Sequence, residues 1–301
     1  FGAVDAVDRQ FPYRQGEFWT LALFCLLGMT LLPGSRDLLL LVVCFELMGL
    51  PLTVLAAFAK SEDRSGPGRF APEAGLKLYL VSAASTSLTL YGLSFLYGLS
   101  ASTRLDAVAA MPSSPLMLTG LVLVLAGMAF KIGSVPFHMW IPDTYQGAST
   151  PFVAFLSVAP KATGFAALAL VLLAGFGAHA ELWRPLVVLL LVASIVVGNL
   201  LALAQTDLKR LLGYSGIAQV GYVLMGLLTA DAQGLGLLLF YLAGYLFANV
   251  SVFLILHGLA PDRSAITLDA VKGLAVRSPR IALALLAALL SLAGIPFVVG
   301  F

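Results

Sequence analysis

The sequence predicts an all-α polytopic membrane protein. Of its 301 residues, 60% are hydrophobic and only 11% are charged, and the mean hydropathy is +0.99. Soluble globular domains are much less apolar, so we expect the lipid bilayer to surround most of the chain. The apolar residues also occur in runs close to the roughly 20 residues that a helix needs to cross a bilayer.

About nine such runs follow a polar lead-in at residues 1–17. They cover approximately residues 18–33, 38–59, 74–98, 116–140, 149–176, 183–204, 208–230, 234–258 and 280–301. The segments between them contain Gly, Pro or mixed charges, most clearly at 60–71, 100–114 and 261–279. Because the last run is still apolar at Phe301, we expect the chain to be part of a longer polypeptide.

The composition also argues against several classes of function. The net charge is only +2 and no basic run with interleaved aromatics is present, so we expect no nucleic-acid partner. Cys25 and Cys44 lie singly inside apolar runs, and we interpret them as small core residues without a redox or metal role. No flavin, iron–sulfur or quinone motif occurs, so we expect no cofactor and no redox centre in this chain.

The positive charges of the connecting segments predict the orientation. Segments on the side of the lead-in contain Arg9, Arg14, Lys60, Arg64, Arg69, Lys209, Arg210, Arg263, Lys272, Arg277 and Arg280. Segments on the opposite side contain Arg36, Arg104 and Arg184. Since Lys and Arg accumulate in cytoplasmic segments, we expect the lead-in to be cytoplasmic. Lys77 lies near a span end and is expected to reach the interface, whereas this pattern does not explain Lys131 and Lys161.

One apolar run combines a cation with a sequence that breaks helices. Lys131 is followed by Gly133, Ser134 and Pro136, and then by His138. A charge within a span costs roughly 2.5–3.5 kcal/mol on insertion scales, so it needs a partner or a function. Broken backbone is tolerated at this depth only where protein buries it or where it lines a wet cavity. We therefore expect the functional site at this break.

Three ionisable residues are predicted to share one depth in the membrane. Glu46, Lys131 and Lys161 each lie near the middle of a predicted span, provided that the span containing Lys131 continues to residue 140. Pro160 precedes Lys161 and is expected to loosen the helix there. If the backbone stays helical, His138 lies about two turns beyond Lys131 on the same face, where it could lead protons toward the cytoplasmic surface.

Each candidate also has a simpler interpretation. Glu46 and Lys131 could form a structural ion pair, and His138 could be an ordinary interfacial histidine. Lys209 lies one turn inside its span; it is expected to serve orientation first, with the interior as an alternative position for its side chain. Asp143 is expected to cap a local turn. Helix-to-helix hydrogen bonds are an alternative to a proton pathway for three polar residues within spans, Asn199, Gln219 and Asn249.

Two sequence patterns occur twice. The segment 131–137, KIGSVPF, is similar to 291–297, SLAGIPF, and the Asp-Leu pair at 37–38 recurs at 207–208. An odd number of predicted spans separates the members of each pair, which reverses the direction of the chain. The patterns therefore predict inverted repeats with a broken helix at the matching place in each half.

Four segments resemble the antiporter-like membrane subunits of respiratory complex I, most closely those of the subunit N type. In chain order they are FKIGSVPFHMWIPDTYQGASTP, FLSVAPKATGFAAL, LAQTDLKRLLGYSGIAQVGYVLMG and SLAGIPFVVGF. The resemblance spans nearly all of residues 17–301. The segment KLYLVSAASTSLTLYGLSFLYG favours subunit N over subunits M and L and over multisubunit cation/proton antiporters.

The resemblance implies a proton channel made of two inverted five-helix repeats with discontinuous helices. Residues 18–176 would form the first repeat, the N-terminal half-channel, and residues 183–301 a truncated second repeat. The motifs place Glu46, Lys131 and Lys161 at the ionisable positions of the family. The ionisable residue of the second broken helix is expected just after Phe301, outside this sequence. With His138 and Lys209, these residues form the candidate site.

The implied function is that of a proton-translocating subunit, without redox centres, of an NADH:quinone oxidoreductase. Expected partners are neighbouring antiporter-like and small membrane subunits, and the expected location is the bacterial inner membrane. A subunit of a multisubunit cation/proton antiporter or a membrane-bound hydrogenase is the alternative. A structural membrane scaffold is a further one, in which the buried charges would be dispensable.

Overall fold

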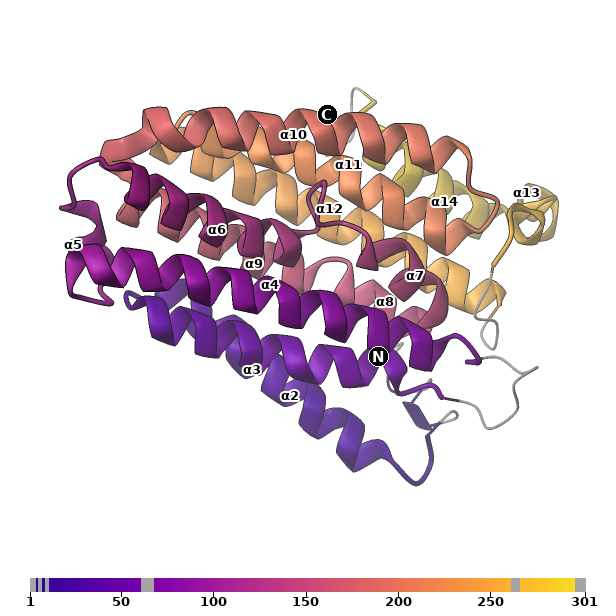
Figure 1. Ribbon diagram of the computed structural model, residues 1–301. Helices are drawn as coiled ribbons and strands as arrows, with labels where there is room; N and C mark the ends of the chain where they lie inside the picture. The colour runs from indigo at the N-terminus through magenta and orange to yellow at the C-terminus, as the bar shows by residue number, and fades with distance from the viewer. Residues whose placement is uncertain (1–3, 5–6, 9–10, 61–67, 261–265, 296–301) are drawn as a thin grey trace.

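The computed structural model describes residues 4, 7–8, 11–60, 68–260 and 266–295, and these form an all-helical bundle (Figure 1). Among the described residues, 8 helical segments are long and apolar enough to cross a membrane. The ninth predicted run is represented by a shorter apolar helix, α14 (Pro279–Leu292). Residues 296–301, where that run was predicted to continue, lie outside the described residues. The all-α polytopic fold class is confirmed.

The N-terminal half contains five α-helices. They are α2 (Gln15–Leu31), α3 (Leu38–Ala57), α4 (Ala71–Ser100), the short α5 (Leu105–Ala109) and α6 (Pro115–Ile132), with a 3-10 turn, η1 (Leu32–Gly34), after α2. Local sequence explains where two of them begin. The carboxylate of Asp37 accepts hydrogen bonds from the first amides of α3, and the hydroxyl of Ser114 accepts one from Met117 in α6. Pro115 follows in the first turn, where no amide hydrogen is needed.

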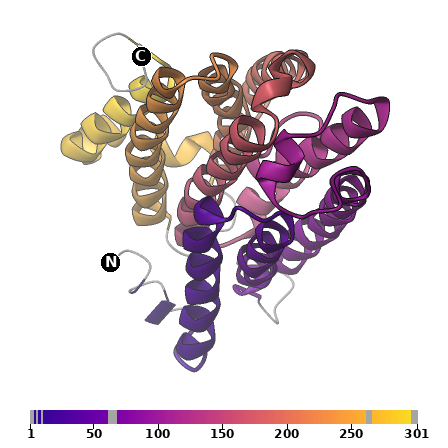
Figure 2. The ribbon, with the colours of Figure 1, turned by 90° about the vertical axis from the view of Figure 1, so that its left-hand side faces the viewer.

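The second half begins with short helices and continues with long ones. They are α7 (Trp140–Gly147), α8 (Thr150–Leu156), α9 (Ala159–Leu170), the π-helical turn η2 (Val171–Gly175), η3 (Gly177–His179), α10 (Ala180–Leu203), α11 (Leu208–Leu228), α12 (Ala232–Leu259), η4 (Leu268–Val271), α13 (Leu274–Arg277) and α14. Figure 2 looks approximately along the bundle and shows the indigo α2 and the yellow α14 on different sides of it. Long helices pack against the short ones: α4 and α11 lie against α7, α3 and α12 against α8, and α6 against α9.

Two predicted spans contain interruptions, and one of these interruptions corrects the predicted bounds. The run 116–140 was predicted as one span, but α6 ends at Ile132 because Gly133 adopts a left-handed conformation with φ of 78°. The chain is then irregular until α7 begins at Trp140. The run 149–176 is confirmed as one candidate span, Thr150–Gly175, although its helix is interrupted between α8 and α9. Both interruptions contain or precede a proline, whose missing amide and bulky ring interrupt the helical hydrogen bonds.

The recurrent Asp-Leu pairs have similar local structures. Asp37 forms an isolated antiparallel bridge with Arg104, and Asp207 forms one with Thr267. Each aspartate also caps the helix that follows it. The first bridge lies beside α5 and the second precedes α13, at opposite ends of the bundle in Figure 1. This arrangement favours the inverted-repeat interpretation.

Candidate functional site

The break after α6 places Lys131 opposite Glu46 of α3. The Nζ atom of Lys131 lies 3.5 Å from Oε1 of Glu46 and 3.3 Å from Oγ of Ser82 in α4. The same Oε1 accepts a hydrogen bond of 2.6 Å from the hydroxyl of Thr86. A direct ammonium–carboxylate bond is usually about 2.7–2.9 Å long, so the pair is in contact without being tightly closed. The Lys131 side chain is 8% exposed and that of Glu46 29%.

Aromatic rings complete the surroundings of Lys131. Its Nζ atom lies 5.5 Å from the ring centre of Phe45 and 5.6 Å from that of Phe130, within the range of cation–π attraction. Gly49 keeps the other side open, because a Cβ atom there would lie 3.2 Å from Nζ. Lys131 is therefore near the end of α6 and not in the middle of a continuous span, which corrects the predicted position.

Two small cavities adjoin Lys131. One of about 10 Å³ lies between it and Glu46 and is lined by Thr86 and Thr89 among others. The other, of about 30 Å³, is lined by Lys131, Thr53, Ser82, Trp140 and Pro160, with Met48, Gly49, Leu52, Leu78, Phe130 and Leu156. The larger cavity has about the volume that one water molecule needs, although most of the side chains around it are apolar. The second cavity extends from Lys131 to the residue directly before Lys161.

Lys161 lies in the first turn of α9 and is buried. Its predicted place near the middle of a span is confirmed, because Thr150–Gly175 is one candidate span. Pro160 does not loosen a continuous helix there but stands at the start of α9, a position that prolines favour. The Nζ atom donates a hydrogen bond of 3.1 Å to the carbonyl of Gly216 in α11. It also lies 5.9 Å from the ring centre of Tyr145. Both of these contacts are with neutral groups, in contrast to the carboxylate that Lys131 meets.

A chain of polar side chains continues from Lys161 between α11 and α12. A Cβ atom on Gly216 would lie 2.9 Å from Nζ of Lys161 and 3.1 Å from the hydroxyl of Tyr245, so both groups face the same gap. The amide of Asn249 donates to that hydroxyl at 3.2 Å and to Ser157 at 2.6 Å. Asn249 therefore connects α12 with the end of α8, and the expected helix-to-helix hydrogen bond is present.

Gln219 and Asn199 make the other expected contacts between helices. The amide of Gln219 donates to the carbonyl of Leu292 at 2.8 Å, and its oxygen accepts from the hydroxyl of Tyr241. Asn199 donates to the carbonyl of Ile195 in its own helix and, at 3.5 Å, to Tyr222. Gln219 therefore joins α11 to the end of α14.

His138 does not occupy the predicted position. His138 would lie on the same helical face as Lys131 only if the helix continued. The helix ends at Gly133, and His138 lies in the irregular segment before α7. Its ring is partly buried, and its Nδ1 atom has no hydrogen-bond partner within the described part of the chain. His138 is thus near the site without lying on the helical face of Lys131.

The side chain of Lys209 faces the interior. This was the alternative to a role in orientation, because the residue lies one turn inside its span. It is fully buried in the first turn of α11, and its Nζ atom donates a hydrogen bond of 2.6 Å to the carbonyl of Ala148. Ala148 is the residue that ends α7. Lys209 therefore ties the start of α11 to the end of the broken helix.

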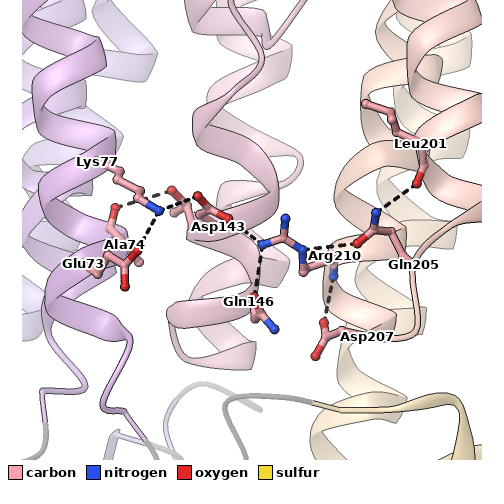
Figure 3. Close-up of polar contacts among 10 residues, drawn as sticks. Glu73, Ala74, Lys77, Asp143, Gln146, Leu201, Gln205, Asp207 and Arg210 are labelled. Carbon is pink, nitrogen blue, oxygen red and sulfur yellow. Dashed lines mark hydrogen bonds and ion pairs between the residues drawn. The ribbon is translucent and has the colours of Figure 1, made fainter.

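Asp143 is not a turn cap, which corrects another expectation. It lies in the first turn of α7, whose cap residue is Met139, and its carboxylate contacts two cations (Figure 3). Lys77 of α4 donates to Oδ2 at 2.7 Å, and Arg210 of α11 donates to Oδ1 at 2.5 Å. Lys77 was expected to reach the interface and Arg210 to serve orientation first; neither expectation included this contact, because it joins residues far apart in the sequence.

Sequence reasoning also missed Ser82 and Thr86. Both lie on the side of α4 that faces Glu46 and Lys131. The signal was present, since the run 74–98 contains hydroxyl residues at helical spacing, namely Ser82, Ser85, Thr86 and Thr89. Across the described ranges, no group of three or more His, Cys, Asp or Glu is arranged to hold a metal ion. Cys25 and Cys44 are buried free thiols.

Comparison with solved structures shows two close folds. The respiratory complex I from Thermus thermophilus with bound Aureothin contains a chain that is 40% identical, with a TM-score of 0.82, over 95% of this chain and 61% of that one. The Mrp complex from Dietzia sp. DQ12-45-1b contains a chain that is 25% identical, with a TM-score of 0.81, over 92% of this chain and 51% of that one.

Comparison with curated sequences shows similarity to quinone oxidoreductase subunits. NADH-quinone oxidoreductase subunit N of Moorella thermoacetica is 43% identical over 96% of this chain and 60% of the relative. NAD(P)H-quinone oxidoreductase subunit 2 of Gloeobacter violaceus is 42% identical over 95% of this chain and 55% of the relative. The chain thus spans about 60% of the length of the first of these relatives. The model of the NADH:quinone oxidoreductase/Mrp antiporter transmembrane family matches residues 35–301, and the chain belongs to this family.

Proposed function

We propose that the chain is the greater part of a subunit N-type membrane subunit of NADH:quinone oxidoreductase, in which it translocates protons. The similarity to subunit N of Moorella thermoacetica over 96% of the chain supports this assignment. Electron transfer would take place in other subunits, because the chain carries no redox motif. Its own contribution would be to change the proton occupancy of buried lysines.

The observation that carries the proposal is the loose pair of Lys131 and Glu46. Their atoms are 3.5 Å apart, and Glu46 is held at the same oxygen by Thr86. In a low-dielectric interior, the attraction between an ammonium and its counter-charge is strong, so a change in their distance changes the energy more than it would in water. A small movement of Glu46 toward or away from Lys131 therefore changes the tendency of Lys131 to hold its proton.

Lys161 is the proposed next proton carrier. The cavity beside Lys131 extends to Pro160, and the polar groups of Tyr245 and Asn249 lie beyond Lys161 toward α12. A proton released at Lys131 would pass through this cavity to Lys161 and then into the second half of the protein. This order is supported by the arrangement of the cavity and of the polar contacts.

His138 and Lys209 complete the proposed site. His138 would exchange protons between Lys131 and the cytoplasmic side, since it lies in the irregular segment between α6 and α7. Lys209 would act where the second half meets α7, through its contact with Ala148. Both roles belong to the same proposal as those of Glu46, Lys131 and Lys161.

The proposed function also implies partners, a location and a division of the chain into repeats. Its partners would be the neighbouring antiporter-like and small membrane subunits, and its location the bacterial inner membrane with the lead-in in the cytoplasm. Residues 18–176 would form the first inverted repeat and residues 183–301 a truncated second one. The similar bridges at Asp37 and Asp207 support this division.

Replacing Lys131 tests the proposal. Lys131→Ala in the full-length protein should leave the assembled complex in place and abolish or strongly reduce proton pumping. The measurement is proton uptake by membrane vesicles during NADH oxidation, divided by the amount of assembled complex. Lys272→Ala is the matched control, because this lysine is 77% exposed and pairs with Asp269, three residues before it. Normal pumping by the Lys131 variant would contradict the proposed function.

A cation/proton antiporter subunit is the second candidate, favoured by the TM-score of 0.81 to a chain of the Mrp complex. The same lysines would then work without an electron-transfer partner. Purification in mild detergent distinguishes the two. Co-purification of subunits with flavin and iron–sulfur centres would support the oxidoreductase, and their consistent absence from an intact complex would support the antiporter.

A further inference from the structure

The short helix α7 is held from two sides by one carboxylate. Asp143 accepts a hydrogen bond from Lys77 of α4 on one oxygen and from Arg210 of α11 on the other (Figure 3). Arg210 also donates to Gln146, one turn further along α7, at 3.1 Å. The carboxylate therefore connects helices of the N-terminal and C-terminal parts of the chain through α7.

Further contacts hold the same helix along its length. The hydroxyl of Thr144 lies 3.5 Å from the carbonyl of Ala74 in α4, and Lys209 donates to Ala148 at the end of α7. Among all these contacts, only those of Asp143 join both neighbouring helices at a single group. Asp143 is 31% exposed and Arg210 26%, so this pair lies at the border of the packed interior and not within it.

The first turn of α7 forms a wall of the cavity beside Lys131. Trp140 lines this cavity and donates a hydrogen bond of 3.3 Å from its indole nitrogen to the carbonyl of Phe130. Trp140 is three residues before Asp143, about one helical turn, so the two side chains belong to the same rigid turn. Any shift of α7 that follows loss of the Asp143 contacts would therefore move Trp140 relative to Lys131.

We propose that Asp143 is a positioning residue that, by bridging Lys77 and Arg210, holds Trp140 closed over the cavity beside Lys131. Loss of the bridge would free the first turn of α7 and admit water to this cavity. The seating of Trp140 over the cavity does not depend on the proposed function. Its consequence for proton transport rests on that function, because uncontrolled water access would let Lys131 exchange protons outside the pumping cycle.

A cysteine reporter at Thr53 tests the position of the wall. Thr53 lines the cavity, is 7% exposed, and uses its hydroxyl within its own helix, with Leu50 as acceptor. In the full-length protein within its complex, Thr53→Cys should react slowly with a small water-soluble methanethiosulfonate. Adding Asp143→Asn, which removes the charge and preserves the shape, should raise the labelling rate several-fold. Adding Asp143→Glu instead should leave labelling closer to the slow rate, because the charge remains.

Matched controls separate loss of the bridge from general damage. Glu73→Gln removes the other carboxylate that pairs with Lys77, at 2.6 Å, without touching α7, and should leave the labelling rate unchanged. The native thiols Cys25 and Cys44 are buried in α2 and α3 and should stay unlabelled in every variant. Mass spectrometry of this subunit reports each cysteine separately.

Two outcomes would overturn the inference. An unchanged labelling rate in the Asp143→Asn variant would show that the bridge does not hold the wall, and simultaneous labelling of Cys25 and Cys44 would show general loosening instead of a local movement. Proton pumping per assembled complex should fall in Asp143→Asn and recover in Asp143→Glu. If labelling responds as expected although Lys131→Ala pumps normally, the positioning role stands and the proposed function fails.

Discussion

The ammonium of Lys131 and the carboxylate of Glu46 are in contact at 3.5 Å, whereas the hydroxyl of Thr86 is bonded to the same carboxylate oxygen at 2.6 Å. Glu46 is thus fixed to α4 more closely than to the lysine whose charge it faces. A buried pair that serves only stability is expected to be tightly closed, because an imperfect pair does not repay the cost of desolvation. The open geometry favours a pair whose distance changes during function.

Two substitutions at Glu46 test this role. Glu46→Gln preserves the shape but deletes the counter-charge of Lys131, and proton pumping per assembled complex should drop. Glu46→Asp preserves the charge on a shorter side chain and should retain more activity, because Coulomb energy weakens gradually with distance. The measurement is pumping in vesicles, normalised to assembled complex.

A structural pair gives the opposite pattern. Glu46→Gln would then lower the amount of assembled complex, while each assembled complex would work near the wild-type rate. Equal normalised pumping by wild type, Glu46→Asp and Glu46→Gln would rule out the electrostatic role. The same two variants therefore distinguish a structural ion pair from one that tunes Lys131 electrostatically.

Gly216→Ala tests whether the position of Lys161 matters. The added Cβ atom would lie 2.9 Å from Nζ of Lys161 and 3.1 Å from the hydroxyl of Tyr245, so the end of the lysine must move. Pumping per assembled complex should fall while assembly persists, because the lysine side chain is flexible. Gly236→Ala in α12 is the control, since a Cβ atom there meets nothing within 4 Å. Equal pumping by the two variants would contradict a role for Lys161 at its present position.

Asp37→Ala should destabilise the start of α3. Loss of the cap should lower the free energy of unfolding by about 1 kcal/mol. The measurement is the decrease in Tm in detergent at neutral pH. The hydrogen bond from Thr103 holds the pKa of Asp37 below its ordinary value of 3.8. Burial opposes this shift, and hydrogen bonds from the amides of Leu40 and Leu39 add to it. The contribution of the Asp37 carboxylate to stability is therefore fully present at pH values above its pKa in the unfolded chain. It is lost as the pH falls through its lower pKa in the folded protein.

The Tm difference between wild type and Asp37→Ala should accordingly be constant near neutral pH and shrink below about pH 4. Asp106→Asn is the control, because the carboxylate of Asp106 is exposed and its surface pair with Arg104 is expected to add little. A Tm difference for Asp37→Ala that grows as the pH falls would contradict the assigned contacts.

Reporters in two connecting segments test the orientation. The segments 60–71 and 100–114 adjoin opposite ends of α4, a single helix of 30 residues. Given the distribution of Lys and Arg, a reporter in 60–71 should be cytoplasmic and one in 100–114 should lie on the opposite side. Two reporters on the same side would refute both the orientation and the crossing of the membrane by α4.

The sequence by itself determined the class of the protein and most of its helices. Membrane character follows from composition, which is a sum over residues and needs no partners. Asp37, Ser114 and Asp207 mark helix starts, because a cap acts on amides within a few residues along the chain. The break after Lys131 was also visible, since Gly133 and Pro136 change the backbone locally.

Only the tertiary structure decided which polar groups meet. Lys77 and Asp143 are 66 positions apart and Lys131 and Glu46 are 85 apart, and no local signal reports either distance. The position of His138 and the acceptor of Lys209 likewise depend on how α7 is seated between other helices. In a membrane protein the sequence says especially little about which helices meet. Lipid and protein interior are both apolar, so hydrophobicity does not reveal which helix faces touch. Close packing and a few hydrogen bonds select those faces, and they are properties of the assembled bundle.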